Sequence, residues 1–314
     1  MTLTELKYIV AVARERHFGR AAEACFVSQP TLSVAIRKLE DELGVQLFER
    51  GSTEVSVTSL GERIVEQAQR VLEDADTIRE IARRGQDPLA GPLRVGVIYT
   101  IGPYLLPALV PRMIDEHPEM PLLLQENFTL KLLELLRQGE IDVAIVAEPL
   151  AAHGLMTQAV YDEPFMVAVP SGHPWAKRDA VGSLELKEQT MLLLGSGHCF
   201  RDHVLEVCPE LSRYSQATDG IQKTFEGSSL ETIRHMVASG IGVTVLPVTA
   251  VPAGGRDSLL AYLPFAAPGP ARRVVLAWRK SFTRAAAIEA LRRTMLSALP
   301  PSVTPLPEAG PQPN

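Results

Sequence analysis

The chain has 314 residues, of which 46% are hydrophobic and 22% charged, and its formal net charge is −6. This length and composition fit two or three packed domains of an ordinary globular protein. No apolar run reaches the roughly 18 residues that cross a bilayer. The first residues lack a signal-peptide pattern, and 3 cysteines are too few for a disulfide-stapled secreted fold. We therefore expect a cytoplasmic protein rather than a secreted or membrane protein.

Residues 1–44 predict three helices. Apolar residues recur at helical spacing over 3–14, and a short alanine-rich helix is expected over 19–25. A third helix should begin after Ser28, which is a good N-cap, and stop at Gly44. Its apolar stripe should face the other two helices and consists of Leu32, Ile36, Leu39 and Leu43.

The second and third helices are arranged like a helix-turn-helix, in which the second of the pair presents side chains to the major groove of DNA. A purely structural three-helix module would have the same periodicity. The first 60 residues carry seven Lys/Arg against eight Asp/Glu, so DNA binding depends on where charge is placed rather than on its total. Glutamine can pair with adenine and arginine with guanine. The candidate DNA contacts are Gln29, Pro30, Thr31, Ser33, Arg37, Lys38 and Arg50.

A small β-wing is expected over 45–57, and a long helix over 59–87. Thr58 or Ser59 should cap this helix, and Ser59 with Glu62 has the spacing of a capping box. Near-heptad spacing of apolar residues is typical of a dimerising helix. Packing on its own globule is the alternative, but the sequence suggests no partner within the chain. The seam consists of Leu60, Ile64, Ala68, Val71, Ala75, Ile78 and Ala82.

After a hinge at 88–91, residues 92–300 predict an α/β domain. Such alternation of strands and helices is typical of mostly parallel sheets covered by helices. The proline-rich tail over 301–314 should be disordered. The expected strands are 93–98, 122–125, 143–146, 165–169, 191–194, 243–246 and 274–278, and the expected helices are 103–116, 130–138, 199–207, 230–239 and 283–299.

The segment 195–208 holds two cysteines and two histidines. Cys199 and Cys208 fit a structural role, since free cysteines are often simply buried, as we expect for Cys25. They also fit an ordinary metabolite sensor in which the thiols do nothing. With His198 and His203 they are competent zinc ligands, although the spacing is not that of a zinc finger.

A redox switch is the remaining interpretation of this segment. Cys199 follows a glycine-rich turn and opens a predicted helix, whose N–H groups and dipole stabilise a thiolate. Peroxide converts a thiolate into a sulfenic acid, which condenses with a second thiol within reach. Nine residues of helix separate Cys199 from Cys208 by about 13 Å, whereas a disulfide needs Cα atoms within about 7 Å. Oxidation would therefore rebuild the helix, unless the segment is already irregular.

Several motifs resemble the LysR-type transcriptional regulators, namely residues 18–22, 28–33, 36–44, 47–50 and 57–61. The resemblance implies a winged helix-turn-helix domain over 1–58, a dimerising helix and a two-lobed regulatory domain similar to periplasmic binding proteins. The cleft between the lobes is then the expected ligand site. We expect lobe one to comprise 92–161 and 268–300, and lobe two 162–267.

The regulatory half is similar to the peroxide-sensing members of that family at 96–107, 197–202 and 225–232, with a further match at Cys208. This resemblance implies that Cys199 is the peroxidatic cysteine and Cys208 the resolving one. It implies promoter DNA, hydrogen peroxide and RNA polymerase as partners, a homodimer or homotetramer, and neither cofactor, metal nor enzyme activity. A metabolite sensor is the alternative function, and a thiol peroxidase would leave the DNA-binding half unexplained. The implied peroxide-binding residues are Thr100, Thr129, His198 and Asp202.

Two of these residues also have a rationale from the pattern alone. Thr100 and Thr129 follow predicted strands, and Thr129 is expected to cap the helix that begins at residue 130. Both hydroxyls would then lie at the carboxyl ends of strands, where α/β sheets bind ligands. The same position would suit a carboxylate metabolite, so the threonines do not separate the two functions.

Overall fold

The structure is a computed structural model that describes residues 1–50, 55–84, 87–150, 153–207, 224–252 and 258–307, together with 310, 312 and 313. The chain divides into two compact units, one formed mainly by residues 1–87 and the other by most of the remaining chain. Among the described residues, no helix is both long enough and apolar enough to cross a membrane.

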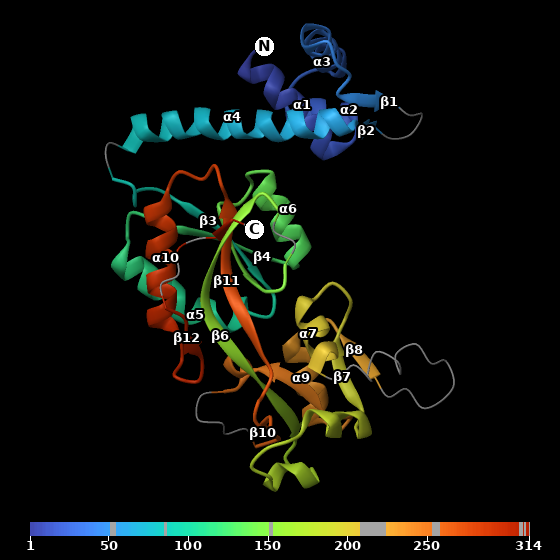
Figure 1. The fold of residues 1–314 in the computed structure, drawn as a ribbon, viewed down its shortest axis with the longest axis vertical. Coiled ribbons are helices and arrows are strands. Elements are labelled where there is room, and N and C mark those ends of the chain that lie inside the picture. The colour runs from blue at the N-terminus through green and yellow to red at the C-terminus, as the bar shows by residue number, and fades with distance from the viewer. Residues whose placement is uncertain are drawn as a thin grey trace. The chain divides into compact units, whose positions relative to one another are not determined.

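The first unit contains the three predicted helices, a two-stranded wing and a long helix (Figure 1). Ser28 caps α3 as expected, because its Oγ accepts a hydrogen bond from the Thr31 N–H at 3.3 Å, and Gly44 ends the helix with φ 69°. The elements are α1 Leu3–Glu15, α2 Phe18–Ala24, α3 Gln29–Leu43, β1 Phe48–Arg50, β2 Val55–Val57 and α4 Ser59–Arg84.

The core of this unit lies between α1, α2, α3 and the start of α4. Three residues of the predicted α3 stripe, Leu32, Ile36 and Leu39, are fully buried. Leu43 is 38% exposed, so its place in the buried stripe was predicted wrongly. It is the last residue of α3, directly before the C-cap Gly44.

The long helix α4 has the first of its two predicted N-caps, but Ser59 does not cap it and the helix has a partner within the chain that was not expected. Thr58 is its N-cap, accepting a hydrogen bond from the Gly61 N–H at 2.9 Å, whereas Ser59 already lies within the helix. Its first half also has a partner within the chain, since Ala68 is buried and Ile64 packs in the same core as α1. Ile78, further along the seam, is 68% exposed.

The second unit is an α/β domain in which β6 and β11 run side by side over most of its length (Figure 1). Its elements up to the middle of the domain are β3 Leu93–Ile98, α5 Gly102–Glu116, β4 Leu122–Asn127, α6 Thr129–Arg137, β5 Val143–Ala147, β6 Leu155–Pro170 and the short helices Pro174–Lys177 and Ser183–Glu188. The later elements are β7 Met191–Leu194, α7 Cys199–Val207, β8 Thr224–Gly227, α9 Leu230–Ala238, β9 Thr244–Pro247, a short helix Val248–Ala250, β10 Leu260–Pro264, β11 Ala271–Arg279 and α10 Ala285–Ala298.

The large sheet is mixed, which corrects the expectation of mostly parallel sheets. Its strand order is β10-β6-β11-β5-β3-β4. In this sheet β3 pairs in parallel with β4 and β5, whereas β11 runs antiparallel to both β5 and β6. The reason is that β6 and β11 each carry the chain from one lobe to the other, and they do so in opposite directions.

The strand β6 is much longer than the predicted strand over 165–169. Its first part pairs with β11 up to Pro164, and its second part pairs with β9 from Phe165 and with β10 from Met166. The strand therefore changes its pairing partners between Pro164 and Met166.

The end of the chain also differs from expectation in its described part. Residues Thr304–Pro305 form β12 and Gln312–Pro313 form β13, and both pair antiparallel with β6. Val303 is 5% exposed. These residues cover an edge of β6 that would otherwise have unpaired backbone groups, which is why a proline-rich composition does not leave this part disordered.

Candidate functional site

Cys199 is the first residue of α7, directly after β7 and a turn over 195–198. Gly197 in that turn has φ 98°, a conformation that L-residues with a side chain rarely adopt. The thiol is half-buried and forms no disulfide. As predicted, it lies where free N–H groups of a helix start face outward and favour a negative charge.

Cys199 lines a small cavity at the carboxyl ends of two parallel strands, β3 and β4. The cavity has about 10 Å³ of free space, roughly the room for one water-sized molecule. Sites for metabolites are usually about 300–1,000 Å³. The cavity therefore fits a very small ligand. Its lining consists of Ile98, Tyr99, Thr100, Asn127, Phe128, Thr129, Gly197, His198 and Cys199.

Thr100 is held in this cavity by a buried arginine that sequence reasoning missed. Arg272 donates to the Thr100 hydroxyl at 2.8 Å and to its carbonyl at 2.9 Å. The same guanidinium forms a fully buried ion pair with Glu163 at 2.6 Å. Because the Thr100 oxygen accepts from Arg272, its own hydroxyl proton remains available to a ligand.

Thr129 also lines the cavity, but not as the predicted helix cap. It is the first residue of α6 itself. Its hydroxyl is buried and has no hydrogen-bond partner among the residues that the structure describes. Burying an unpaired hydroxyl costs roughly 1–3 kcal/mol, so a ligand in the cavity that accepts or donates one hydrogen bond would offset that cost.

His198 closes one side of the cavity and is 8% exposed. Its ring packs edge-on against Phe128 at 4.8 Å and Tyr99 at 6.0 Å. Burial lowers the pKa of His198, against the opposing effect of a hydrogen bond to the Ser228 backbone. The imidazole is therefore neutral near pH 7, since a group with an ordinary pKa of about 6.5 is already mostly neutral there.

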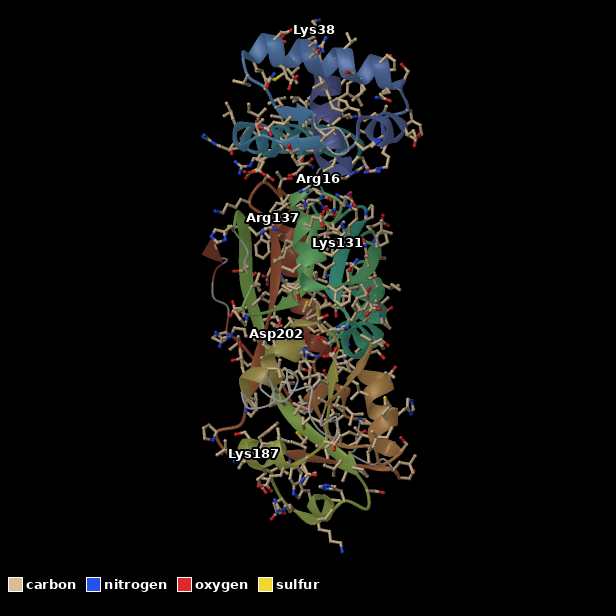
Figure 2. The ribbon with its side chains drawn as sticks, turned by 90° about the vertical axis from the view of Figure 1, so that its right-hand side faces the viewer. Arg16, Lys38, Lys131, Arg137, Lys187 and Asp202 are labelled. Atoms are coloured by element: carbon tan, nitrogen blue, oxygen red, sulfur yellow. The ribbon has the colours of Figure 1, made fainter. Side chains whose placement is uncertain are left out.

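Asp202 is not among the residues that line the cavity. It is exposed in the first turn of α7 (labelled in Figure 2). Cys208 lies outside the described residues. Cys25 lies at the edge of the core of the first unit, where burial raises the pKa of its thiol.

His203 lies one turn after Cys199 on α7 and was considered only as a zinc ligand. It is 7% exposed, and its Nε2 lies 2.8 Å from the Glu148 carbonyl oxygen. Nδ1 is buried without a partner. Among the residues that the structure describes, no three His, Cys, Asp or Glu side chains gather as a metal site.

The candidate DNA contacts lie on the outer side of α3. Gln29, Pro30, Thr31, Arg37 and Lys38 are exposed, and Ser33 is half-buried. Figure 2 shows Lys38 directed away from the other helices of this unit. Arg50 ends β1, and its side chain lies outside the described part of the structure.

Both halves of the chain match one family. Residues 3–62 match the bacterial regulatory helix-turn-helix proteins of the lysR family, and residues 86–300 match the LysR substrate binding domain. The chain therefore belongs to the LysR family of bacterial regulatory proteins. This confirms the predicted fold class, a helix-turn-helix domain joined to a two-lobed α/β regulatory domain.

Within this family the chain is similar to OxyR. It is 40% identical over 279 residues to the DNA-binding transcriptional dual regulator OxyR of Escherichia coli K12, covering 89% of this chain and 90% of that protein. It is 41% identical, with the same coverage, to the hydrogen peroxide-inducible genes activator of Pectobacterium carotovorum. The resemblance to the peroxide-sensing branch of the family is thereby confirmed.

The chain is also similar to solved structures of OxyR proteins. A full-length OxyR variant from Pseudomonas aeruginosa is 52% identical with a TM-score of 0.74, covering 94% of this chain and 98% of that one. A Corynebacterium glutamicum OxyR mutant with hydrogen peroxide bound is 36% identical with a TM-score of 0.64, covering 95% and 92%.

The environment of His203 predicts how stability depends on pH. Burial lowers the pKa of His203, and Arg272 adds to this effect, while the Glu148 backbone, Glu206 and Asp202 oppose it. Below about pH 6.5 the unfolded chain binds more protons at this position than the folded chain, so folding stability is lost as the pH falls. We expect the Tm of the reduced protein to decrease between about pH 7.5 and 5.5, and less so in His203→Gln.

The matched control is His235→Gln, which removes an exposed histidine from α9 and should keep the parent's pH profile. Thermal melts across this pH range measure the effect. Parallel profiles for the parent and His203→Gln would show that His203 does not contribute.

Proposed function

We propose that this chain is a transcription factor that senses hydrogen peroxide through Cys199. The single observation that supports this most is the cavity beside the thiol, which has room for about one water-sized molecule and is lined by two threonine hydroxyls. Hydrogen peroxide is close to that size and both donates and accepts hydrogen bonds. A metabolite of ordinary size does not fit beside Cys199, so the alternative of a metabolite sensor gains no support at this site.

In the proposed first step the Cys199 thiolate attacks one oxygen of hydrogen peroxide and the O–O bond breaks. The sulfur becomes a sulfenic acid, and the leaving hydroxide takes up a proton to become water. The Thr100 hydroxyl accepts from Arg272, so its proton can be donated to the peroxide. The unpartnered Thr129 hydroxyl supplies a second contact. Together the two hydroxyls orient the O–O bond toward the sulfur. Holding reacting atoms in line in this way lowers the barrier to the reaction.

In the second step the Cys208 thiol attacks the sulfenic sulfur, a disulfide forms and a second water leaves. Cys199 begins α7 and Cys208 follows its last residue, Val207. About nine residues of intact helix would keep the sulfur atoms too far apart. Disulfide formation therefore requires α7 to unwind, which withdraws Phe200 and Val204 from the core of their lobe. A local oxidation is thereby converted into a change of conformation.

The output of the switch is control of promoter DNA by the helix-turn-helix. We propose that the exposed part of the α4 seam pairs two copies, as homodimers or homotetramers, so that the spacing of two α3 helices is the regulated quantity. Exposed Ile78 supports this role of α4. The relatives are transcriptional regulators, and we extend to this chain a cytoplasmic location, contact with RNA polymerase and the absence of enzymatic turnover.

Thiol counting tests the redox switch. One equivalent of hydrogen peroxide should remove two of the 3 free thiols of the reduced protein, since the reaction joins Cys199 to Cys208. Cys199→Ser should keep both of its remaining thiols. Cys208→Ser should lose one, as a sulfenic acid trapped by dimedone. Cys25→Ser is the control and should still lose two. An unchanged thiol count in the parent, alongside an intact response to peroxide at its promoter, would refute the proposal.

A hydroxyl deletion tests the role of the cavity. Thr129→Val removes a hydroxyl that has no partner, so we expect the Tm of the variant to equal or exceed that of the parent. Oxidation of Cys199 should nevertheless slow by about tenfold to a hundredfold. The rate is measured by stopped-flow fluorescence or by timed alkylation.

Thr244→Val is the matched control. The buried Thr244 hydroxyl donates to the Leu192 carbonyl at 2.7 Å, away from the cavity lining. We expect a loss of about 1 kcal/mol in stability at an unchanged oxidation rate. Equal oxidation rates for the parent and Thr129→Val would remove Thr129 from the proposed mechanism.

A further inference from the structure

Phe26 occupies an unusual position in the turn between α2 and α3. Its N–H donates to the Glu23 carbonyl at 3.0 Å, and the N–H of Val27 donates to the Ala22 carbonyl at 3.0 Å. These two hydrogen bonds define the Schellman motif that ends many helices. In this motif the residue after the C-cap is left-handed and is usually glycine. Here it is Phe26, with φ 57°.

The phenylalanine is unfavourable at this position as far as the chain itself is concerned. A left-handed conformation costs a residue with a Cβ roughly 1–2 kcal/mol, and glycine or asparagine would avoid most of that cost. The ring does not compensate by packing in the core, because Phe26 is 95% exposed. A residue that breaks a local rule without a gain in the folded chain is a candidate for a functional contact.

The turn leads directly into the DNA-reading helix. Phe26 is two residues before Ser28, the cap of α3, and three before Gln29, the first candidate DNA contact. On α3 itself Val34 is another apolar residue, and it is 69% exposed among the polar candidates. The two exposed apolar residues thus belong to the same turn and helix as the candidate DNA contacts, within the residues that match the helix-turn-helix proteins of the family.

The nearly neutral charge of the helix-turn-helix domain means that apolar contacts would add to its affinity for DNA. The first 60 residues hold seven basic against eight acidic side chains, so phosphate attraction alone gives modest affinity. Apolar side chains bind DNA at the thymine methyl group and along the deoxyribose rings. Such contacts do not release counterions, and they add affinity that salt does not screen.

We propose that Phe26 is a DNA-contact residue, whose ring packs against deoxyribose and thymine methyl groups at the edge of the groove entered by α3. The left-handed turn aims the ring outward and holds it in place before DNA binds. In this proposal Phe26 lowers the stability of the free domain and raises its affinity for DNA.

The experiment uses the full-length protein and the variant Phe26→Gly. The probe is a duplex selected by the parent protein from a random-sequence library, with a scrambled duplex for comparison. Glycine fits the left-handed turn, so we expect a Tm at or above that of the parent. Binding to the selected duplex should weaken about 5- to 30-fold, as expected for the loss of a buried aromatic contact. The slope of log affinity against log salt should not change, since no phosphate contact is lost.

Three further arms make the outcome specific. Phe26→Asn, which also tolerates the turn but has no ring, should reproduce the loss. Leu184→Gly, at an exposed apolar residue of the regulatory domain, should leave DNA affinity at the parent value. Replacing thymine by deoxyuridine in the duplex should weaken the parent, and weaken Phe26→Gly less, if the methyl group is the contact. Equal losses in both proteins assign the contact to deoxyribose.

Two results would overturn the proposal. One is an affinity of Phe26→Gly for the selected duplex equal to that of the parent. The other is a fall in Tm together with a shift to smaller oligomers on gel filtration, because Phe26 would then contact a second copy of the chain rather than DNA.

Discussion

The buried ion pair between Arg272 and Glu163 is the interaction on which the regulatory domain depends. The two residues lie directly opposite each other on β11 and β6, and both side chains are fully excluded from solvent. Glu163 also accepts from Thr249, just after β9, while Arg272 donates to Thr100, just after β3. One pair of charges therefore connects both lobes at the strands that pass between them.

Such a pair is costly to bury and still more costly to break. Removing one partner from a buried pair typically destabilises a protein by about 3–5 kcal/mol, because the other charge is left uncompensated. Here the guanidinium is satisfied by a carboxylate, a hydroxyl and a carbonyl, and it lies 5.2 Å above the ring of Phe200. This network fixes the Thr100 side of the cavity.

The opposite side of the cavity is formed by the start of α7, where Arg201 donates to the Leu194 carbonyl at 2.8 Å and Phe200 packs in the core of its lobe. Cys199 lies on a short helix beside the two-stranded sheet of β7 and β8, and His203 links that helix to the Glu148 carbonyl through one hydrogen bond. The proposed first step needs fixed geometry, and the proposed second step needs α7 to unwind and give up these contacts.

Much of this fold follows from patterns of residues in the sequence. Helices with caps and apolar stripes, such as α3 between Ser28 and Gly44, were predicted almost to the residue. The strand β6 was not, because Gln158 and Glu163 interrupt its apolar pattern, and Glu163 is buried with a partner, Arg272, that lies far away in the chain. Long-range pairing of this kind has no local signature.

The candidate site likewise combines features that the local sequence predicts with features that depend on distant strands. Cys199 at a helix start was predicted, since the glycine-rich turn and the following helical pattern are local features. The missing partner of Thr129 and the contact of Arg272 with Thr100 depend on how distant strands meet. Asp202 was carried over by resemblance and lies exposed, outside the cavity lining.

The central claim is that a cavity of the size of one small molecule selects hydrogen peroxide for Cys199. The most direct measurement is the rate of thiol oxidation in the reduced full-length protein by hydrogen peroxide and by cumene hydroperoxide, with free cysteine as the reference. Relative to that reference, the account predicts that hydrogen peroxide is favoured by roughly tenfold or more, because the bulky peroxide cannot enter. Equal preference in the protein and in free cysteine would contradict the account.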